Sequence, residues 1–245
     1  MYEFSDIVVI LAVFLFCGTV KGIVGFGLPV LAIAMLSLTF DARIGMVLVL
    51  MPAITTNIWQ SFVGGKLREI MLRIWPFLLT AMIAIWFASG FLNVVDGALL
   101  TRLLGLLLVV YALSTLAGVT LELGGRREKW AGPVVGILNG VFTGLTGSLS
   151  VPGVLFLNSI GLPRALLRQA MGLLFLVSST TLMVALYFRG ALSIEANLVS
   201  ALSVVPALSG MLLGEWLGKY LPEDLFRRIF LIGLTMLGAT LILNG

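Results

Sequence analysis

The chain has 245 residues, of which 60% are hydrophobic and only 11% are charged, and its mean hydropathy is +1.16. One soluble core cannot bury so much apolar surface, so the composition excludes a soluble globular domain and indicates an integral membrane protein. The net charge of +4 comes from basic residues in short loops rather than on one soluble face, so we expect no nucleic acid partner.

The chain contains no histidine and a single cysteine, Cys17. These absences remove the usual ligands of zinc and haem and the usual bases of Ser-His and Cys-His catalysis. A disulfide within the chain is also excluded. We therefore expect no metal, no cofactor and no enzymatic activity, and we interpret Cys17 as a small buried apolar residue.

Apolar runs of spanning length follow one another along the whole chain. They cover residues 7–38, 44–63, 70–92, 98–121, 131–162, 165–188, 198–221 and 225–243. A membrane-spanning helix needs about 20 residues, and helices satisfy their own backbone groups in lipid, so the sequence predicts an all-α membrane protein. The opening "MYEFSD" has no basic residue before the first run, so we expect no cleaved signal peptide.

The runs form two similar halves, a first repeat at 1–121 and a second repeat at 131–245. The polar stretch "ELGGRREKW" at 122–130 links them. The first half contains "KGIVGFGLP" at 21–29 and the second contains "TGLTGSLSVP" at 143–152. Further on, each half carries a polar cluster, "TTN" at 55–57 and "SSTT" at 178–181. The shared order of these features predicts an internal duplication.

The basic residues test how the runs cross the membrane. If all eight runs cross once, the two sides hold equal numbers of loop cations, which contradicts the positive-inside rule. If runs 7–38 and 131–162 instead enter and turn back, most loop cations share one side. That side holds Lys66, Arg68, Arg73, Arg126, Arg127, Lys129, Arg164, Arg168, Lys219, Arg227 and Arg228, and the other holds Arg43, Arg102 and Arg189. Four tryptophans, Trp59, Trp75, Trp130 and Trp216, fall near the richer side.

This count predicts that each repeat is a re-entrant helical hairpin plus three transmembrane helices. An odd number of crossings makes the two repeats inverted. Residues 122–130 are then a cytoplasmic linker, and both termini face the periplasm. Residues 7–20 would descend about 21 Å, past the middle of a ~30 Å core, before the glycines turn the chain. We expect the second turn, at 144–150, to reach the same depth.

Each returning arm begins at a proline, Pro29 or Pro152. Proline suits the first turn of a helix because its missing N–H would be unpaired there anyway. Two helix N-termini would then point at one central site. Their free N–H groups and positive dipole ends predict a receptor for a small anion.

Two stretches carry a resemblance to a known family. "VKGIVGFGLPVLAIAML" and "GVFTGLTGSLSVPGVLFL" resemble the half-signatures of the TauE/SafE sulfite exporter family, also called the sulfonate uptake permease family, and the resemblance covers essentially the whole chain. The second departs from the common pattern, with Ser148, Leu149 and Ser150 where many members have glycines. The resemblance implies transport of sulfite, sulfoacetate, thiosulfate or related anions across a bacterial inner membrane.

We predict that the substrate is bound by the two turns and the two polar clusters. The candidate residues are Lys21, Gly22, Gly25, Phe26, Gly27, Asn57, Thr146, Gly147, Ser148, Ser150 and Ser179. A lysine at membrane depth costs about 2.5–3.5 kcal/mol on insertion scales and usually marks a pathway. The alternative for Lys21 is snorkelling or an internal pair. The alternative for Asn57 and Ser179 is a bond to a neighbouring helix.

Other motifs favour scaffolding. Glycines recur every fourth residue at Gly132, Gly136, Gly140 and Gly144, and at Gly210, Gly214 and Gly218, and such stripes let helices pack closely. Glu215 and Lys219 have the spacing of a local ion pair.

Away from the loops, the apolar runs contain no acidic residue or histidine that could relay protons, so proton coupling is not favoured. An inside-negative potential drives each negative charge outward by about 2.3 kcal/mol per 100 mV, which favours export. Cation-coupled import of a sulfonate or another small organic anion is the alternative, with Na⁺ held by carbonyls of the broken helices. A non-transporting scaffold also stays open, and so does a homodimer. The expected partners are the anion and the lipid bilayer.

Overall fold

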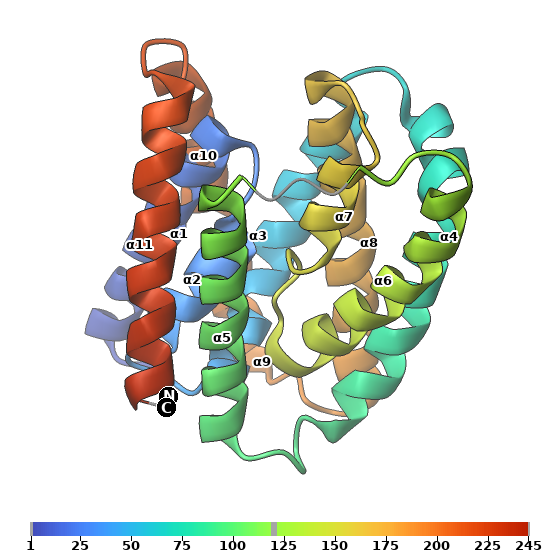
Figure 1. Ribbon diagram of the computed structural model, residues 1–245. Coiled ribbons are helices and arrows are strands. Elements are labelled where there is room, and N and C mark those ends of the chain that lie inside the picture. Colours follow the sequence, from blue (N-terminus) through green and yellow to red (C-terminus); the bar gives the residue numbers. More distant parts are fainter. Residues whose placement is uncertain (1, 119–121, 245) are drawn as a thin grey trace.

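The computed structural model describes residues 2–118 and 122–244, and every regular element in these ranges is a helix (Figure 1). The helices are α1 (Phe4–Val24), α2 (Leu28–Leu36), α3 (Ala42–Phe62), α4 (Leu67–Ala88), η1 (Ser89–Phe91), α5 (Gly97–Leu116), α6 (Arg126–Thr146), α7 (Gly153–Ser159), α8 (Arg164–Phe188), α9 (Ile194–Leu202), α10 (Val204–Leu217) and α11 (Glu223–Asn244). The all-α prediction is confirmed.

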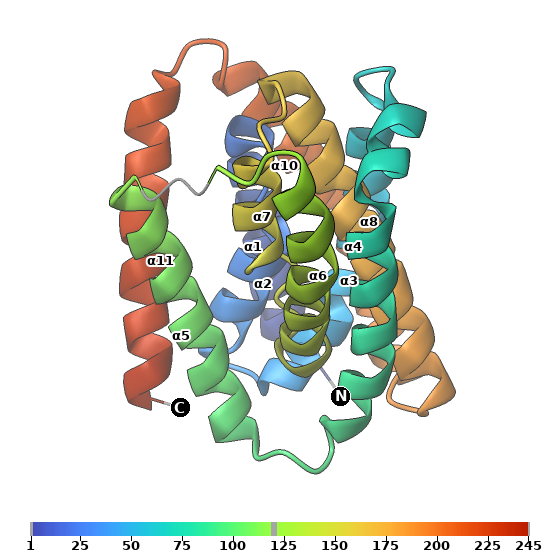
Figure 2. The ribbon, with the colours of Figure 1, turned by 45° about the vertical axis from the view of Figure 1, so that its right-hand side comes forward.

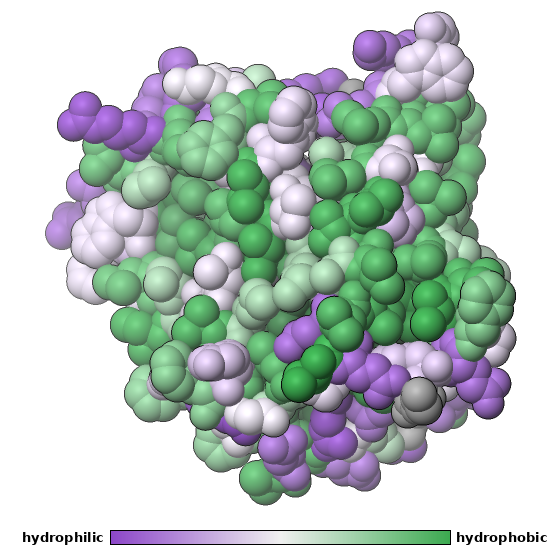
Figure 3. All heavy atoms as spheres, turned by 180° about the vertical axis from the view of Figure 1, so that it is seen from behind, coloured by the Kyte–Doolittle hydropathy of each residue, from purple (hydrophilic) through white to green (hydrophobic). Residues whose placement is uncertain are grey.

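Within the described residues, seven helical segments are long and apolar enough to cross a membrane. They are α1, α3, α4 with η1, α5, α8, α9 with α10, and α11. The helix α6 is as long as α1, but its first turn is charged and it does not reach the hydropathy of a span. Hydrophobic atoms cover the middle of the face seen in Figure 3, and hydrophilic atoms gather towards its two ends. The chain is a multi-pass membrane protein.

At each of the two glycine-rich turns, a long helix is followed by a short one, and each such helix-turn-helix pair is here called a hairpin. In the first hairpin, α1 ends at Gly25, whose φ is 89°, and α2 begins after Gly27, whose φ is 105°. Glycine adopts these left-handed conformations at no steric cost. The helix α1 runs to Val24, so the expectation that it stops at Val20 is wrong. Gly22 does not break it because its φ is helical, and only Gly25 ends it.

The second hairpin repeats this local design. The helix α6 ends at Gly147, whose φ is 70° and whose N–H donates to the carbonyl of Thr143 at 2.8 Å. In the first hairpin, the N–H of Gly25 donates to the carbonyl of Lys21 at 2.7 Å. Proline opens each returning helix as expected, since Pro29 lies in the first turn of α2 and Pro152 immediately precedes α7.

The helix ends gather into two sets (Figures 1 and 2). The connections at 63–66, 160–163 and 218–222 lie at one end of the bundle, here called the linker end. The chain termini lie at the opposite end, the termini end, together with the connections at 38–41, 92–96 and 189–193. All eleven cations expected to share one side lie near helix ends of the linker end.

Glycine stripes pack two pairs of helices closely, as expected. A Cβ at Gly214 of α10 would lie 2.0 Å from the carbonyl oxygen of Thr19 in α1. A Cβ at Gly136 of α6 would lie 2.4 Å from the carbonyl oxygen of Phe77 in α4. Backbones that approach this closely leave no room for any other residue. The stripes therefore fix α1 against α10 and α4 against α6.

Glu215 and Lys219 are both exposed, and the described part of the chain shows no ion pair between them. Their expected local pair is not formed.

Candidate functional site

Lys21 is buried in the interior of the bundle, with only 2% of its surface exposed. Its Nζ donates to Oγ1 of Thr56 at 3.0 Å and to Oδ1 of Asn57, both on α3. Both acceptors are neutral. Lys21 is also the only charged side chain among the buried residues that the structure describes. The ammonium group therefore has no countercharge beside it.

Several buried polar atoms in the described residues have no hydrogen-bond partner. They are Nδ2 of Asn57, Nδ2 of Asn139, and the hydroxyls of Ser148, Ser150 and Ser178. Buried polar groups are nearly always paired, so a group of orphans needs an explanation. Two amide N–H donors and three hydroxyls can all donate to an oxyanion. Three of the five residues, Asn57, Ser148 and Ser150, are predicted site residues.

Helices α3 and α8 run antiparallel, and their register places part of this set at one level. Gly172 of α8 packs on Gln60 and Ser61 of α3. Ser178 lies six residues after Gly172. Because the helices are antiparallel, Ser178 faces the part of α3 that lies about six residues before Gln60. That level is about one helical turn from Asn57. Lys21 reaches this level from α1.

Adjacent serines of α8 differ in their bonding. The hydroxyl of Ser179, the predicted site residue, donates to the carbonyl of Phe175 at 2.6 Å within its own helix. The hydroxyl of Ser178 has no partner. The geometry therefore favours Ser178 over Ser179 as the group available to a ligand.

The tip of the second hairpin is held by its own side chains. The hydroxyl of Thr146 donates to the carbonyl of Phe142 at 2.8 Å and accepts from the N–H of Ser148 at 3.2 Å. Gly153 is the first residue of α7, and its N–H donates to Oδ1 of Asn139 at 2.9 Å. Thr146 thus shapes the turn, and the N-terminus of α7 is already capped.

The two hairpin tips lie at different levels, and the expectation of one shared depth is wrong. The carbonyl of Gly25 accepts from Nε2 of Gln60, near the linker end of α3. Gly147 packs against Met46, near the termini end of α3. The two contacts are 14 residues apart on α3, which is about 21 Å along its axis. The hairpins pass one another because α1 continues to Val24.

Three predicted residues of the first hairpin have close packing contacts. A Cβ at Gly22 would lie 2.2 Å from the carbonyl oxygen of Met211 in α10. Phe26 lies edge-on between Tyr111 and Phe230, with ring centroids 5.9 and 5.7 Å away. Gly27 also faces the ring of Phe230. These residues anchor the tip against α5, α10 and α11.

A cross-link at the linker end was missed by sequence reasoning. Nε2 of Gln60 donates to the carbonyls of Gly25 and Arg168, both at 2.8 Å. Nε2 of Gln169 donates to the carbonyl of Ser61 at 2.8 Å. These two amides tie α3, α8 and the first tip together. The signal was available, because Gln60 lies one helical turn after Thr56 and Asn57 on the same face of α3.

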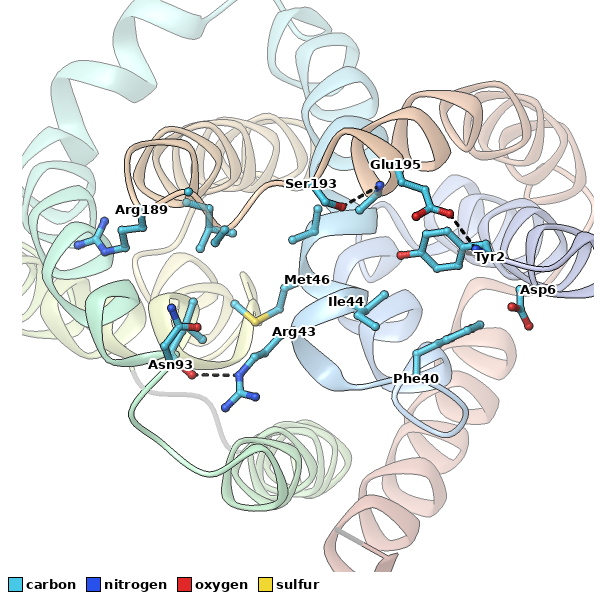
Figure 4. Close-up of a pocket in the computed structure, with 16 residues that line it drawn as sticks. Tyr2, Asp6, Phe40, Arg43, Ile44, Met46, Asn93, Arg189, Ser193 and Glu195 are labelled. Carbon is cyan, nitrogen blue, oxygen red and sulfur yellow. Dashed lines mark hydrogen bonds between the residues drawn. The ribbon is translucent and has the colours of Figure 1, made fainter.

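A cavity of about 630 Å³ opens at the termini end, here called the vestibule (Figure 4). Arg43 and Arg189 lie on one side of it, and Asp6 and Glu195 lie on the other. Both guanidinium groups are anchored, Arg43 by the carbonyls of Leu92 and Val95, and Arg189 by those of Ala185 and Trp86. The cavity thus has a cationic wall of fixed geometry.

Tyr2 lines the vestibule on the same side as Asp6 and Glu195. Its backbone N–H donates to Oε1 of Glu195 at 2.8 Å. Burial raises the pKa of its phenol above the ordinary value, and the charges of Glu195 and Asp6 raise it further. The phenol is therefore neutral at physiological pH.

Met46 forms part of the vestibule lining, and Gly147 packs directly behind it. A Cβ at Gly147 would lie 2.7 Å from Cγ of Met46 and 2.7 Å from Cδ1 of Ile33. Ser148 and Ser150 follow Gly147 in the chain, and both are buried. Met46 therefore lies between the vestibule and the tip that carries the two orphan hydroxyls.

A comparison with known families gives a match over nearly the whole chain. The model described as "Sulfite exporter TauE/SafE" matches residues 10–241. No curated protein and no solved structure matches the chain. The matched range includes both hairpins, Lys21 and all the orphan polar groups. The chain therefore belongs to the TauE/SafE sulfite exporter family, a family of multi-pass membrane transporters.

Proposed function

We propose that this transporter exports small sulfur oxyanions or organosulfonates, such as sulfite or sulfoacetate, across the bacterial inner membrane. The proposed central site consists of Lys21, Asn57 and Ser178, and the tip serines Ser148 and Ser150 belong to the proposed route from this site towards the vestibule. Thr56 completes the central site by holding the lysine ammonium from α3.

The observation that carries this proposal is the buried ammonium of Lys21, which has only neutral acceptors. Burying a charge without a countercharge is costly, and such charges normally find a partner. An anion bound beside Lys21 supplies that partner. The orphan donors of Asn57 and Ser178 then supply the hydrogen bonds that a sulfite or sulfonate oxygen accepts.

The same donor set predicts which anions bind. The site offers an ammonium, an amide and hydroxyls, and the described interior has no buried carboxylate. A second ammonium on the substrate would therefore meet Lys21 without an acidic partner. Sulfite and sulfoacetate should bind better than taurine, which is a zwitterion.

Direction and topology follow from charge. The cation-rich linker end faces the cytoplasm by the positive-inside rule, so the vestibule opens to the periplasm. The inside-negative potential then drives anions from the central site towards the vestibule. Each repeat is a re-entrant hairpin plus three crossings in this arrangement, and the two repeats are inverted. Residues 122–130 form the cytoplasmic linker.

The test is anion flux in proteoliposomes that contain purified wild-type or Lys21→Gln protein, at matched amounts of folded protein. We expect Lys21→Gln to abolish saturable efflux of sulfite and sulfoacetate. Lys21→Arg should restore it only partly, because the planar guanidinium needs a different geometry. Lys219→Gln is the matched control, since Lys219 is exposed at the linker end.

Unchanged flux and affinity in Lys21→Gln would remove Lys21 from the site. Equal binding of taurine and sulfoacetate would show that the site does not select its ligand by charge. Wild-type protein that carries none of the tested sulfur anions, under a potential of either sign, would contradict transport of this substrate class.

A further inference from the structure

The helices α4 and α6 pack closely through most of their length and separate towards the linker end. A Cβ at Gly140 would lie 2.4 Å from the carbonyl oxygen of Ala81, and one at Gly136 would lie 2.1 Å from Oγ1 of Thr80. At Gly132 the nearest atom is Cζ of Phe156, at 3.4 Å. The seam between the two helices therefore opens above Gly136.

Two grooves follow this seam. The groove near the linker end has a volume of about 550 Å³, and its wall includes Leu72, Trp75 and Pro133. The next groove has a volume of about 650 Å³ and is lined by apolar side chains, with Thr80 as its single polar residue. On α6, the residues that line the two grooves recur every fourth position, and each directly follows a glycine of the stripe. They are Pro133, Ile137, Val141 and Leu145.

Lys129 continues this series by one helical turn and lines the groove at its linker end. Arg126 lines a hollow of about 880 Å³ on the other side of Lys129. Both cations are exposed and have no ion pair within the described residues. The one carboxylate in the groove wall, Glu128, is already held by Arg73, with contacts of 2.7 and 2.9 Å.

Two tryptophans mark the depth of this cationic group. Trp75 is 54% exposed on α4 and Trp130 is 72% exposed on α6. Exposed tryptophans of membrane proteins concentrate at the level of the lipid headgroups. Lys129 and Arg126 therefore lie where phosphates lie, and the apolar grooves below them lie where acyl chains lie.

We propose that the α4–α6 seam is a binding site for one anionic phospholipid of the linker-end leaflet. Its phosphate binds between Lys129 and Arg126, and one acyl chain follows Pro133, Ile137, Val141 and Leu145. The distance from Lys129 to Leu145 along α6 is 16 residues, or about 24 Å, which suits a single extended chain. Charge selects the headgroup, and the groove selects a lipid over a soluble phosphate.

The test is binding of phosphatidylglycerol to the purified protein, counted by native mass spectrometry and followed by the melting temperature in mixed micelles. Phosphatidylcholine micelles of equal lipid content are the reference. We expect the double variant Arg126→Gln/Lys129→Gln to bind phosphatidylglycerol roughly 30-fold more weakly, from about 1 kcal/mol for each cation near a membrane surface. Its melting temperature should no longer respond to this lipid.

Two further variants make the test specific. Lys219→Gln/Arg228→Gln removes two exposed cations of the same end that lie outside the groove, and it should bind phosphatidylglycerol as the wild type does. Ile137→Trp keeps every charge but fills the groove, and it should weaken binding as well. Equal losses of phosphatidylglycerol binding in both double variants would show that general surface charge, and not this site, binds the lipid. If soluble glycerol phosphate raised the melting temperature as much as phosphatidylglycerol does, the ligand would be a free phosphate rather than a lipid. Unchanged binding in Arg126→Gln/Lys129→Gln would overturn the proposal.

Discussion

Met46 and Gly147 are packed together at the boundary between the vestibule and the second hairpin tip. A Cβ on Gly147 would lie 2.7 Å from Cγ of Met46, so the thioether side chain fills the space beside the tip. Met46 itself is 1% exposed, yet it lines the vestibule. A flexible, unbranched side chain in this place can change rotamer without moving a helix.

Shortening Met46 should therefore widen the route between the vestibule and Ser148. We expect Met46→Ala to transport bulkier sulfonates faster relative to sulfite than the wild type does. Leu48→Ala is the control, because Leu48 is fully buried in the same helix but does not line the vestibule. Both variants lose about 2–5 kcal/mol of stability, so competition flux at matched folded protein is the measurement. An identical size preference in both variants would exclude Met46 as a barrier.

The adjacent residues Ser178 and Ser179 give a matched pair of substitutions. The hydroxyl of Ser178 has no partner, while that of Ser179 is bonded within α8. A hydrogen bond to a charged ligand contributes about 1.5–3 kcal/mol. We expect Ser178→Ala to raise the KM for sulfite efflux about tenfold and Ser179→Ala to leave it unchanged. A raised KM in Ser179→Ala with an unchanged KM in Ser178→Ala would place Ser179 in the site and exclude Ser178 from it.

The glycine stripe between α4 and α6 predicts a difference in stability. Gly136→Ala would force a methyl group against the backbone of Phe77 and should destabilise the fold by about 1–3 kcal/mol. Gly233→Ala in α11 meets nothing within 4 Å and should stabilise it by up to about 1 kcal/mol through helix propensity. Melting curves in one detergent compare the two. Equal melting temperatures would show that α4 and α6 tolerate separation.

Much of the fold could be predicted because its signals are local. Glycine at positive φ ends α1 and α6, proline opens the returning helices, and glycine stripes mark the close helix pairs. The depth of the tips could not be predicted, because several glycines precede each turn and only the backbone shows which one leaves the helix. Gly22 stays helical, and Gly25 does not.

The candidate site divides in the same way. The sequence singles out Lys21 as a candidate, since a charge inside an apolar run is rare. Asn57 is another predicted candidate, and its bond to Lys21 is seen only in the structure. The choice between Ser178 and Ser179 was not, because neighbours on a helix point about 100° apart and only the packing of α8 decides which hydroxyl stays free. Phe26 looked like a site residue because it lies between two turn glycines, but its ring packs against Tyr111 and Phe230.

The re-entrant topology predicts which positions react from each side of the membrane. Lys129 and Asn158 lie on the two arms of the second hairpin, and both residues are exposed. Each is replaced by a single cysteine in a protein that lacks Cys17. In whole cells a membrane-impermeant maleimide should leave both unlabelled, while cysteines at Glu3 and Leu38, which flank the first hairpin, should react. Asn93 is the positive control for the periplasmic side. Opening the cells should make Lys129 and Asn158 react together, because α6 and α7 enter and leave by the same face. Labelling of Lys129 and Asn158 from opposite faces would mean that this segment crosses the membrane, and the two repeats would then not be inverted copies with three crossings each.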